Sequence, residues 1–228
     1  MTISNAMKDE MVLAIPKGRI LPQASALLQR AGIQIDQEQL AARKLTVATS
    51  WPELRVSVLR NSDILLAVRS GTADLAIVGK DQLAEDGGDD FYDLLDLGIA
   101  RCWLKVAAPA GYQRCTRLVR VATKFSNLTR SYYATQGIQA QIVKLNGAME
   151  LAVQIGLADE IVDLVESGRT LAENNLEAIA TLLEVSSHLI ANRDRLITKH
   201  AAVHRLLGAM EAMLREQGAS TSYKQVGQ

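Results

Sequence analysis

Cysteine and histidine are scarce in this sequence, and neither sign of charge is in excess. The two cysteines, Cys102 and Cys115, lack the spacing of a metal or redox site, so we expect reduced thiols and a cytoplasmic protein. The 25 basic and 25 acidic side chains cancel, which excludes the strongly basic surface that binds nucleic acid or an anionic membrane. No apolar run reaches the roughly 18 residues of a membrane helix. The basic residues that matter should therefore be local, placed for a small anionic ligand.

The first ten residues have no apolar core, so we expect no secretory signal. Ser4-Asn5-Ala6-Met7 resembles a cloning remnant before a native Met7, and residues 1–6 are left out of the fold prediction. The polar tail after Gly218 is expected to fray. The remaining chain, with 48% hydrophobic residues overall, is long enough for one large core or two smaller ones.

Short apolar runs alternate with helical patterns along the chain. Strands are expected at residues 12–15, 45–49, 54–59, 73–78, 118–122, 141–145 and 161–165, with a strand-rich region at 94–109. Helices are expected at 21–31, 62–70, from 79 onward, at 126–136 and 148–155, and as one long amphipathic helix at 193–217. Continuous apolar strands that alternate with helices predict an α/β fold with largely parallel sheets, covered on both faces.

The most informative segment covers residues 150–171. Its apolar stretch 161–165 predicts a buried strand that carries one acid, Asp163, and the turn 167–170, Ser-Gly-Arg-Thr, follows at once and begins a helix. Such a turn offers backbone N–H groups to a phosphate, its glycine permits close approach, and its two hydroxyls add donors. A carboxylate near the end of the strand accepts hydrogen bonds from sugar hydroxyls. The segment therefore predicts a site for a ribose 5-phosphate.

A simple capped turn between a strand and a helix explains the same Ser-Gly-Arg-Thr residues without any ligand. The acid favours the phosphate site, because an unpaired carboxylate inside an apolar strand is costly.

The same segment resembles the signature of ATP phosphoribosyltransferases, the first enzymes of histidine biosynthesis. The matching positions are Glu150, Gly156, Ala158, Ile161, Asp163, Ser167, Gly168, Thr170 and Leu171. So many fixed positions make the motif specific, unlike a lone glycine-rich loop. Further matches run from Val12 to Asn192 and include Lys17-Gly18-Arg19 and Arg43-Lys44-Leu45.

Some positions depart from the family pattern. Ala148 stands where a serine is usual, Val153 replaces a frequent proline, and Asn175 stands where glycine is usual. These departures leave the expected reaction class unchanged but bear on substrate affinity and loop motion.

The resemblance implies a fold like that of type II periplasmic binding proteins, with two α/β lobes and a cleft between them. Lobe I would hold residues 7–101 and the returning segment 188–228, and lobe II would hold residues 102–187. The length resembles that of the short form of the family. It implies a homodimer that joins a regulatory subunit resembling histidyl-tRNA synthetase in a hetero-octamer.

The implied substrates are ATP and 5-phosphoribosyl pyrophosphate, with substrate-bound Mg²⁺. Adenine N1 carries no proton, so its attack on the ribose needs no general base, and catalysis depends on cations aimed at the departing pyrophosphate. Arg suits pyrophosphate because its fork binds two oxygens and stays charged. No protein ligand for the metal is expected.

The resemblance assigns roles to individual residues. Arg19 and Arg43, helped by Lys17, would be the catalytic cations. Arg60 would bind the nucleotide together with Lys17 and Arg19. The phosphoribosyl pyrophosphate site would consist of Glu150, Asp163, Ser167, Gly168, Arg169, Thr170 and Leu171.

Two other functions fit parts of the pattern. A solute-binding protein would share the lobed fold, but the expected absence of a signal peptide and the full signature count against it. A salvage phosphoribosyltransferase would place two adjacent acids before the phosphate turn, whereas here only Asp163 falls in that region. His200 and His204 lack the acid between them and the third ligand of a zinc pair, so they and His188 are interpreted as structural or surface residues.

Overall fold

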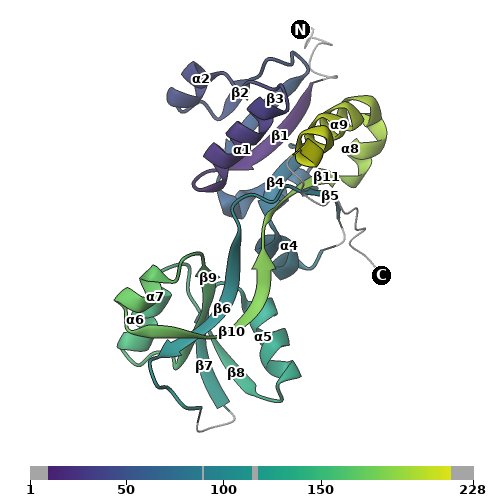
Figure 1. Ribbon diagram of the computed structural model, residues 1–228. Helices are drawn as coiled ribbons and strands as arrows, with labels where there is room; N and C mark the ends of the chain where they lie inside the picture. Colours follow the sequence, from purple (N-terminus) through teal and green to yellow (C-terminus); the bar gives the residue numbers. More distant parts are fainter. Residues whose placement is uncertain (1–9, 89, 115–117, 217–228) are drawn as a thin grey trace, which may run out of the picture. The chain divides into compact units, whose positions relative to one another are not determined.

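The computed structural model describes residues 10–88, 90–114 and 118–216, which form two compact units (Figure 1). Unit 1 contains the described residues up to Lys80, those of 88–100, and those from Ser186 onward. Unit 2 contains residues 81–87 and the described residues of 101–185. The expected remnant at residues 1–6, Cys115 and the tail after Gly218 lie outside the described residues.

Unit 1 is built on a six-stranded sheet with the order β2-β3-β1-β4-β11-β5. Its strands are β1 (Met11–Pro16), β2 (Thr46–Ala48), β3 (Leu54–Leu59), β4 (Leu75–Gly79), β5 (Phe91–Asp96) and β11 (Ser187–Asn192). The three strands β3, β1 and β4 are parallel, and β2, β11 and β5 each run antiparallel to a neighbour. Every residue of β4 and β11 is buried, which explains why β4 reads as a continuous apolar run.

The helical elements of unit 1 cover this sheet. They are α1 (Ile20–Arg30), α2 (Gln37–Ala41), the 3₁₀ turn η2 (Asn61–Asp63), α3 (Ile64–Arg69), α8 (Arg193–Thr198) and α9 (His200–Glu216). Helices α1 and α9 lie side by side (Figure 1) and share one hydrophobic core with the sheet. Leucines 206 and 207 and Met210 of α9 are buried there at helical spacing, as an amphipathic helix requires.

The single long helix expected at 193–217 is wrong, because the structure breaks it into α8 and α9 at Lys199. The Lys199 backbone leaves helical geometry, at φ −116° and ψ 30°. Its ammonium group lies 2.9 Å from Asp74 Oδ2 and 2.5 Å from the carbonyl oxygen of Glu10. Asp74 is almost fully buried, so its charge needs this cation. The ion pair thus accompanies a break that helical periodicity does not reveal.

Unit 2 is built on a five-stranded sheet with the order β10-β6-β9-β7-β8. Its strands are β6 (Cys102–Pro109), β7 (Leu118–Thr123), β8 (Gln139–Lys144), β9 (Glu160–Val165) and β10 (Leu176–Val185). Its helices are α4 (Lys80–Asp86), α5 (Ser126–Thr135), α6 (Met149–Gln154) and α7 (Arg169–Glu173). The first residue of α4, Lys80, still belongs to unit 1, and the rest of the helix belongs to unit 2. One face of the sheet packs on Tyr133 of α5, and a separate core joins Met149 of α6 to Leu171 of α7.

Helix α4 is tied to unit 2 by a side-chain cap. The Glu85 carboxylate accepts hydrogen bonds from the backbone N–H groups of Asn127 and Leu128, at 2.9–3.1 Å and 3.0 Å. These are unpaired donors in the first turn of α5, where a negative charge is favourable.

Both sheets are mixed, so the expectation of largely parallel sheets is corrected, although the α/β class holds. Among the described residues, unit 1 has parallel pairs at β1–β3 and β1–β4 alone, and unit 2 at β7–β8 and β9–β7 alone. Strands β10 and β11 follow one another late in the chain and pair antiparallel with β6 and with β4 and β5. Apolar runs report burial but not strand direction, so the sequence pattern could not reveal this pairing.

Candidate functional site

In unit 1, basic residues gather where parallel strands end. Lys17 follows the last residue of β1 and Arg60 the last residue of β3, and those last residues, Pro16 and Leu59, are register partners. The Lys17 N–H donates to the Leu59 carbonyl at 2.8 Å, so the chain leaves both strands at the same edge. In α/β sheets this carboxyl edge is where ligands bind.

Arg19 and Arg43 approach the same edge from two turns. Arg19 directly precedes α1, after Gly18 at φ +97°. Arg43 lies three residues before β2, which runs antiparallel to β3, and the Val58 N–H donates to the Leu45 carbonyl at 2.8 Å. The segment that holds Arg43 therefore runs beside the end of β3.

Lys17, Arg19, Arg43 and Arg60 are called the edge cations below. All four are exposed. Within the part of the chain that the structure describes, Lys17, Arg43 and Arg60 form no salt bridge, so their charges face solvent. A cluster of exposed cations at a strand edge attracts a multiply charged anion.

In unit 2, the carboxylate of Asp163 lies on the face of β9 covered by α6 and α7, because its i±2 neighbours Ile161 and Val165 pack in the core under those helices. Its Oδ1 accepts the backbone N–H of Leu164 at 2.8 Å. Burial raises the pKa of the Asp163 carboxyl, and the charge of Glu150 in the first turn of α6 raises it further. The Leu164 hydrogen bond and the nearby Lys124 ammonium lower the pKa, but burial dominates.

The turn after β9 has the geometry expected of a phosphate-binding turn. Gly168 is left-handed, at φ +76° and ψ 0°, and directly precedes α7. A Cβ at this position would meet only the Val165 side chain, at 4.0 Å, so backbone conformation rather than space favours glycine. Ser167 and Thr170 are exposed, and Ser167 Oγ accepts the Arg169 N–H at 3.4 Å.

The remaining two predicted residues of this turn differ in environment. Leu171 is only 6% exposed and packs in the core below the turn, so its side chain anchors the turn. Arg169 is exposed and forms an ion pair with Glu173, one helical turn away, at 2.7 Å. A substrate phosphate would have to compete with Glu173 for this guanidinium.

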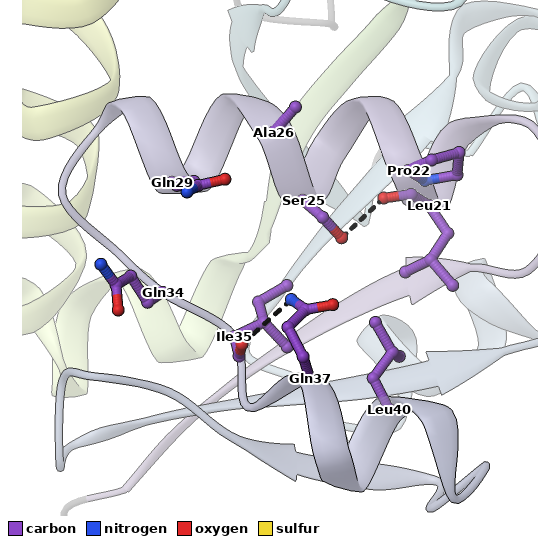
Figure 2. A pocket seen from close by; sticks show the side chains of 9 residues that line it. All are labelled: Leu21, Pro22, Ser25, Ala26, Gln29, Gln34, Ile35, Gln37 and Leu40. Atoms are coloured by element: carbon purple, nitrogen blue, oxygen red, sulfur yellow. Dashed lines mark hydrogen bonds between the residues drawn. The ribbon is translucent and has the colours of Figure 1, made fainter.

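A hollow of about 540 Å³ lies elsewhere in unit 1, between α1 and α2 (Figure 2). Its walls combine apolar side chains such as Leu21 and Leu40 with the amides of Gln29, Gln34 and Gln37. It is lined by none of the predicted site residues and by no charged side chain. An uncharged hollow does not compensate the charge of a phosphate, so the strand edges remain the candidate site.

Comparison with known proteins decides the family. The sequence model "HisG: ATP phosphoribosyltransferase" matches residues 60–212. An ATP phosphoribosyltransferase from Marinobacter nauticus is 44% identical over 211 residues, which cover 92% of this chain and 99% of that protein. One from Saccharophagus degradans is 43% identical over 212 residues, covering 93% and 100%. The chain belongs to the ATP phosphoribosyltransferase family.

Solved structures agree with this family assignment. The structure of the ATP phosphoribosyl transferase (HisG:HisZ) complex from Thermotoga maritima contains a chain with 29% identity and a TM-score of 0.78, covering 90% of this chain and 99% of that chain. The alkanesulfonate-binding protein SsuA from Xanthomonas axonopodis has 16% identity and a TM-score of 0.53, covering 92% and 75%. That second likeness shows the fold alone, and it confirms the periplasmic-binding-protein-like class.

ATP phosphoribosyltransferases are pentosyltransferases that catalyse the first step of histidine biosynthesis, and this chain shares that function. The residues matched by the family model include Arg60 and the whole segment 150–171, whereas Lys17, Arg19 and Arg43 precede them.

The structure adds a basic residue to the transferase's candidate site that the sequence-based assignment of roles omitted. Lys124 directly follows the last residue of β7, Thr123, which pairs in parallel with Val162 of β9. It therefore lies beside Asp163, whose pKa it lowers. The available signal was a cation directly after an apolar strand, a position that Lys17 and Arg60 share.

Among the described residues of the transferase, no group of three or more His, Cys, Asp or Glu side chains could hold a metal ion. His188 is buried in β11 and its Nδ1 lies 2.8 Å from Asp93 Oδ1, which agrees with a structural role. The rings of His200 and His204 lie 4.0 Å apart on α9. No described helix is long and apolar enough to cross a membrane.

Proposed function

We propose that the edge cations and the Asp163 turn are the two parts of the transferase site. In the reaction, adenine N1 of ATP bonds to C1 of the ribose of 5-phosphoribosyl pyrophosphate, and the bond from C1 to the pyrophosphate oxygen breaks with inversion. The electron pair of that bond leaves with pyrophosphate. Since N1 carries no proton, the residues need only bind, orient and neutralise charge.

The edge cations neutralise the negative charge of the departing pyrophosphate and of the nucleotide. Arg19 and Arg43 stabilise the charge that develops on the departing pyrophosphate, helped by Lys17, and Arg60 binds the nucleotide together with Lys17 and Arg19. Their exposure and their common position at the carboxyl ends of β1 and β3 support these roles. The guanidinium fork is suited to two phosphate oxygens at once.

The unit 2 residues hold the phosphoribosyl group. The Asp163 and Glu150 carboxylates accept hydrogen bonds from ribose hydroxyls, and the turn 167–171 binds the 5-phosphate. The raised pKa of Asp163 supports this role, because a buried carboxylate gains most when a donor reaches it. The exposed hydroxyls of Ser167 and Thr170 are accessible to the phosphate.

Mg²⁺ enters this proposal as part of the substrates. The phosphate oxygens of the substrates would hold the ion, which would neutralise charge on the departing pyrophosphate.

The proposal extends to assembly and location. The relative from Thermotoga maritima was solved as a HisG:HisZ complex, which supports a complex of this chain with a second kind of subunit. In that complex a homodimer of this chain would join a regulatory subunit resembling histidyl-tRNA synthetase in a hetero-octamer. Units 1 and 2 would serve as lobes I and II of a cytoplasmic enzyme. The expected lobe limits, 7–101 with 188–228 and 102–187, differ from the units at residues 81–87 and 101, which belong to unit 2, and at 186–187, which belong to unit 1.

The observation that carries the proposal is the register of β1 and β3, which places Lys17 and Arg60 at one edge within a chain of this family. The test mixes the protein, ATP, 5-phosphoribosyl pyrophosphate and Mg²⁺, and follows the ultraviolet absorbance of N1-alkylated ATP. Product is expected. Its absence, even with the regulatory subunit added, would refute the assignment, and binding without turnover would indicate a solute-binding role instead.

A further inference from the structure

Two side chains on one face of α1 hold opposite ends of a single residue, Ala100. Gln23 Oε1 accepts the Ala100 N–H at 2.8 Å. Arg19 Nη2 donates to the Ala100 carbonyl at 3.0 Å. Arg19 and Gln23 are four positions apart, so their side chains lie on the same side of the helix start.

Ala100 has a conformation that needs support. It is 6% exposed, and its φ of +51° lies in the left-handed region, which is unfavourable for a non-glycine residue. It is also the last residue of unit 1 before the chain enters β6 of unit 2. The peptide that carries the Ala100 N–H is also held at its other end, because the Ser187 N–H donates to the Ile99 carbonyl at 3.0 Å.

We infer that Gln23 is a positioning residue for Arg19, acting through Ala100; this rests on the proposed catalytic role of Arg19. Gln23 and the Ser187 N–H hold the two ends of the peptide that precedes the Ala100 Cα. Through the backbone torsions of Ala100, this restrains the next peptide, whose carbonyl accepts one N–H of the Arg19 guanidinium. An arginine side chain loses rotamer entropy when it is immobilised. Here the hydrogen bond to the Ala100 carbonyl removes part of this entropy loss before the substrate pyrophosphate binds.

Gln23→Met tests the contact, since methionine has a similar length but no strong acceptor. The Ala100 N–H loses its partner, the peptide before the Ala100 Cα keeps only the Ser187 contact, and the Ala100 carbonyl restrains the Arg19 guanidinium less firmly. We expect kcat to fall about tenfold, the equivalent of one hydrogen bond of about 1.4 kcal/mol, with the KM for ATP and for 5-phosphoribosyl pyrophosphate changed less than about twofold. Gln23→Asn, whose shorter side chain cannot reach Ala100, should give the same result and serves if the methionine variant does not fold.

The matched control is Gln29→Met, the same change on the same helix. Gln29 is exposed and lines the hollow between α1 and α2 (Figure 2) rather than contacting Ala100. Its kcat should equal that of the unaltered protein. Thermal unfolding of each variant separates a loss of folded protein from a loss of turnover.

The decisive experiment combines Gln23→Met with Arg19→Ala. If Gln23 acts through Arg19, it should lower kcat no further once Arg19 is gone. Equal losses in both backgrounds, or an unchanged kcat in Gln23→Met alone, would overturn the inference while leaving the transferase assignment intact. An unchanged kcat in Arg19→Ala would remove the catalytic role of Arg19 and this inference with it. A complete lack of product from the unaltered protein would refute the proposed function itself.

Discussion

Lys17 and Arg60 are 43 positions apart in the sequence but follow the last residues of two parallel strands that end in register, β1 and β3. The hydrogen bond from the Lys17 N–H to the Leu59 carbonyl fixes this arrangement. Because the sheet sets the spacing, the cations do not depend on a flexible loop for their common position. Rigid placement of charge is what electrostatic catalysis requires.

Replacement of Arg19 or Arg43 by alanine should lower turnover more than it weakens substrate binding. Each guanidinium acts on charge that grows as pyrophosphate departs, so its loss raises the barrier more than it changes ground-state affinity. We expect kcat to fall about 10²- to 10³-fold, with KM changed only a few-fold, as for other lost electrostatic donors. Steady-state kinetics with each substrate varied in turn measure both constants.

Arg215→Ala is the control for this pair. Arg215 lies on α9, is exposed, and contacts Glu211 on the same helix. The same loss of one positive charge there should leave kcat unchanged. A similar decrease in all three variants would show that net charge, rather than position at the strand edge, is responsible.

Replacement of Asp163 by asparagine should weaken the affinity for 5-phosphoribosyl pyrophosphate and raise stability at neutral pH. The ribose hydroxyls lose a charged acceptor, worth about 1.5–3 kcal/mol or roughly 10- to 150-fold in Kd. The pKa of Asp163 is raised by burial, so the folded state binds the proton more tightly than the unfolded chain. Its stabilising effect is therefore present below the unfolded pKa and is lost as pH rises through the folded pKa. Calorimetric titration and thermal unfolding between pH 4 and pH 8 measure the two effects.

Asp159→Asn, just before the start of β9, is a control in which the pKa shift has the opposite sign. The hydrogen bond from the Arg120 guanidinium lowers the pKa of the Asp159 carboxyl, so its contribution to stability is present above the unfolded pKa and is lost as pH falls through the folded pKa. Asparagine there should lower stability at neutral pH and leave the substrate affinity unchanged. Equal affinity losses in both variants would contradict a specific ribose contact at Asp163.

Local pattern predicted much of the fold. Strand β3 covers the expected residues 54–59, and β9 extends the expected stretch 161–165 by one residue. Strand β10 was not expected, because most of its residues are exposed or half-buried at the sheet edge and its pairing has two irregularities. Local sequence does not show which sheet such a strand joins.

Part of the candidate site could likewise be predicted from the sequence, and part could not. The turn around Gly168 and the acid of β9 lie on one continuous segment, so spacing alone brings them together. The contacts of Ala100 with Gln23 and Arg19 join residues 77 and 81 positions apart. No periodicity connects those positions, and an alanine carries no signal that its backbone will be left-handed.

Replacement of Ala148 by glycine should stabilise the protein. Ala148 directly precedes α6 at φ +50° and ψ +46°, a left-handed conformation that costs alanine about 1–2 kcal/mol. Glycine removes that cost but adds about 0.4–1 kcal/mol of freedom to the unfolded chain. The net gain of about 0.5–1 kcal/mol should raise Tm by about 1–4 °C.

Ala134→Gly is the matched control for this substitution. Ala134 lies in the last turn of α5 and is exposed, so the same change should cost up to about 1 kcal/mol there. Differential scanning calorimetry compares the two variants with the unaltered protein. A lower Tm in both variants would mean that the strain at Ala148 is smaller than the entropy gained by glycine.

Replacement of Arg114 by methionine should destabilise unit 2 strongly. The Glu160 side chain is completely buried, and Arg114 binds its two oxygens at 2.8 and 2.7 Å. The Tyr133 hydroxyl donates to the same carboxylate. Removing Arg114 leaves a buried charge whose side-chain partners are neutral hydroxyls such as that of Tyr133. The loss should approach about 3 kcal/mol, the lower end for a broken buried pair because Arg114 is partly exposed.

Glu160→Gln in the same chain distinguishes charge from packing. Once Glu160 is neutral, the further loss on changing Arg114 to methionine should be small, and a double-mutant cycle from urea unfolding measures the difference. Arg120→Met breaks the more exposed pair with Asp159 and should cost much less. Additive losses at Arg114 and Glu160 would assign the effect to the contact between the Arg114 side chain and the Tyr133 ring, 5.4 Å apart, rather than to the buried charge.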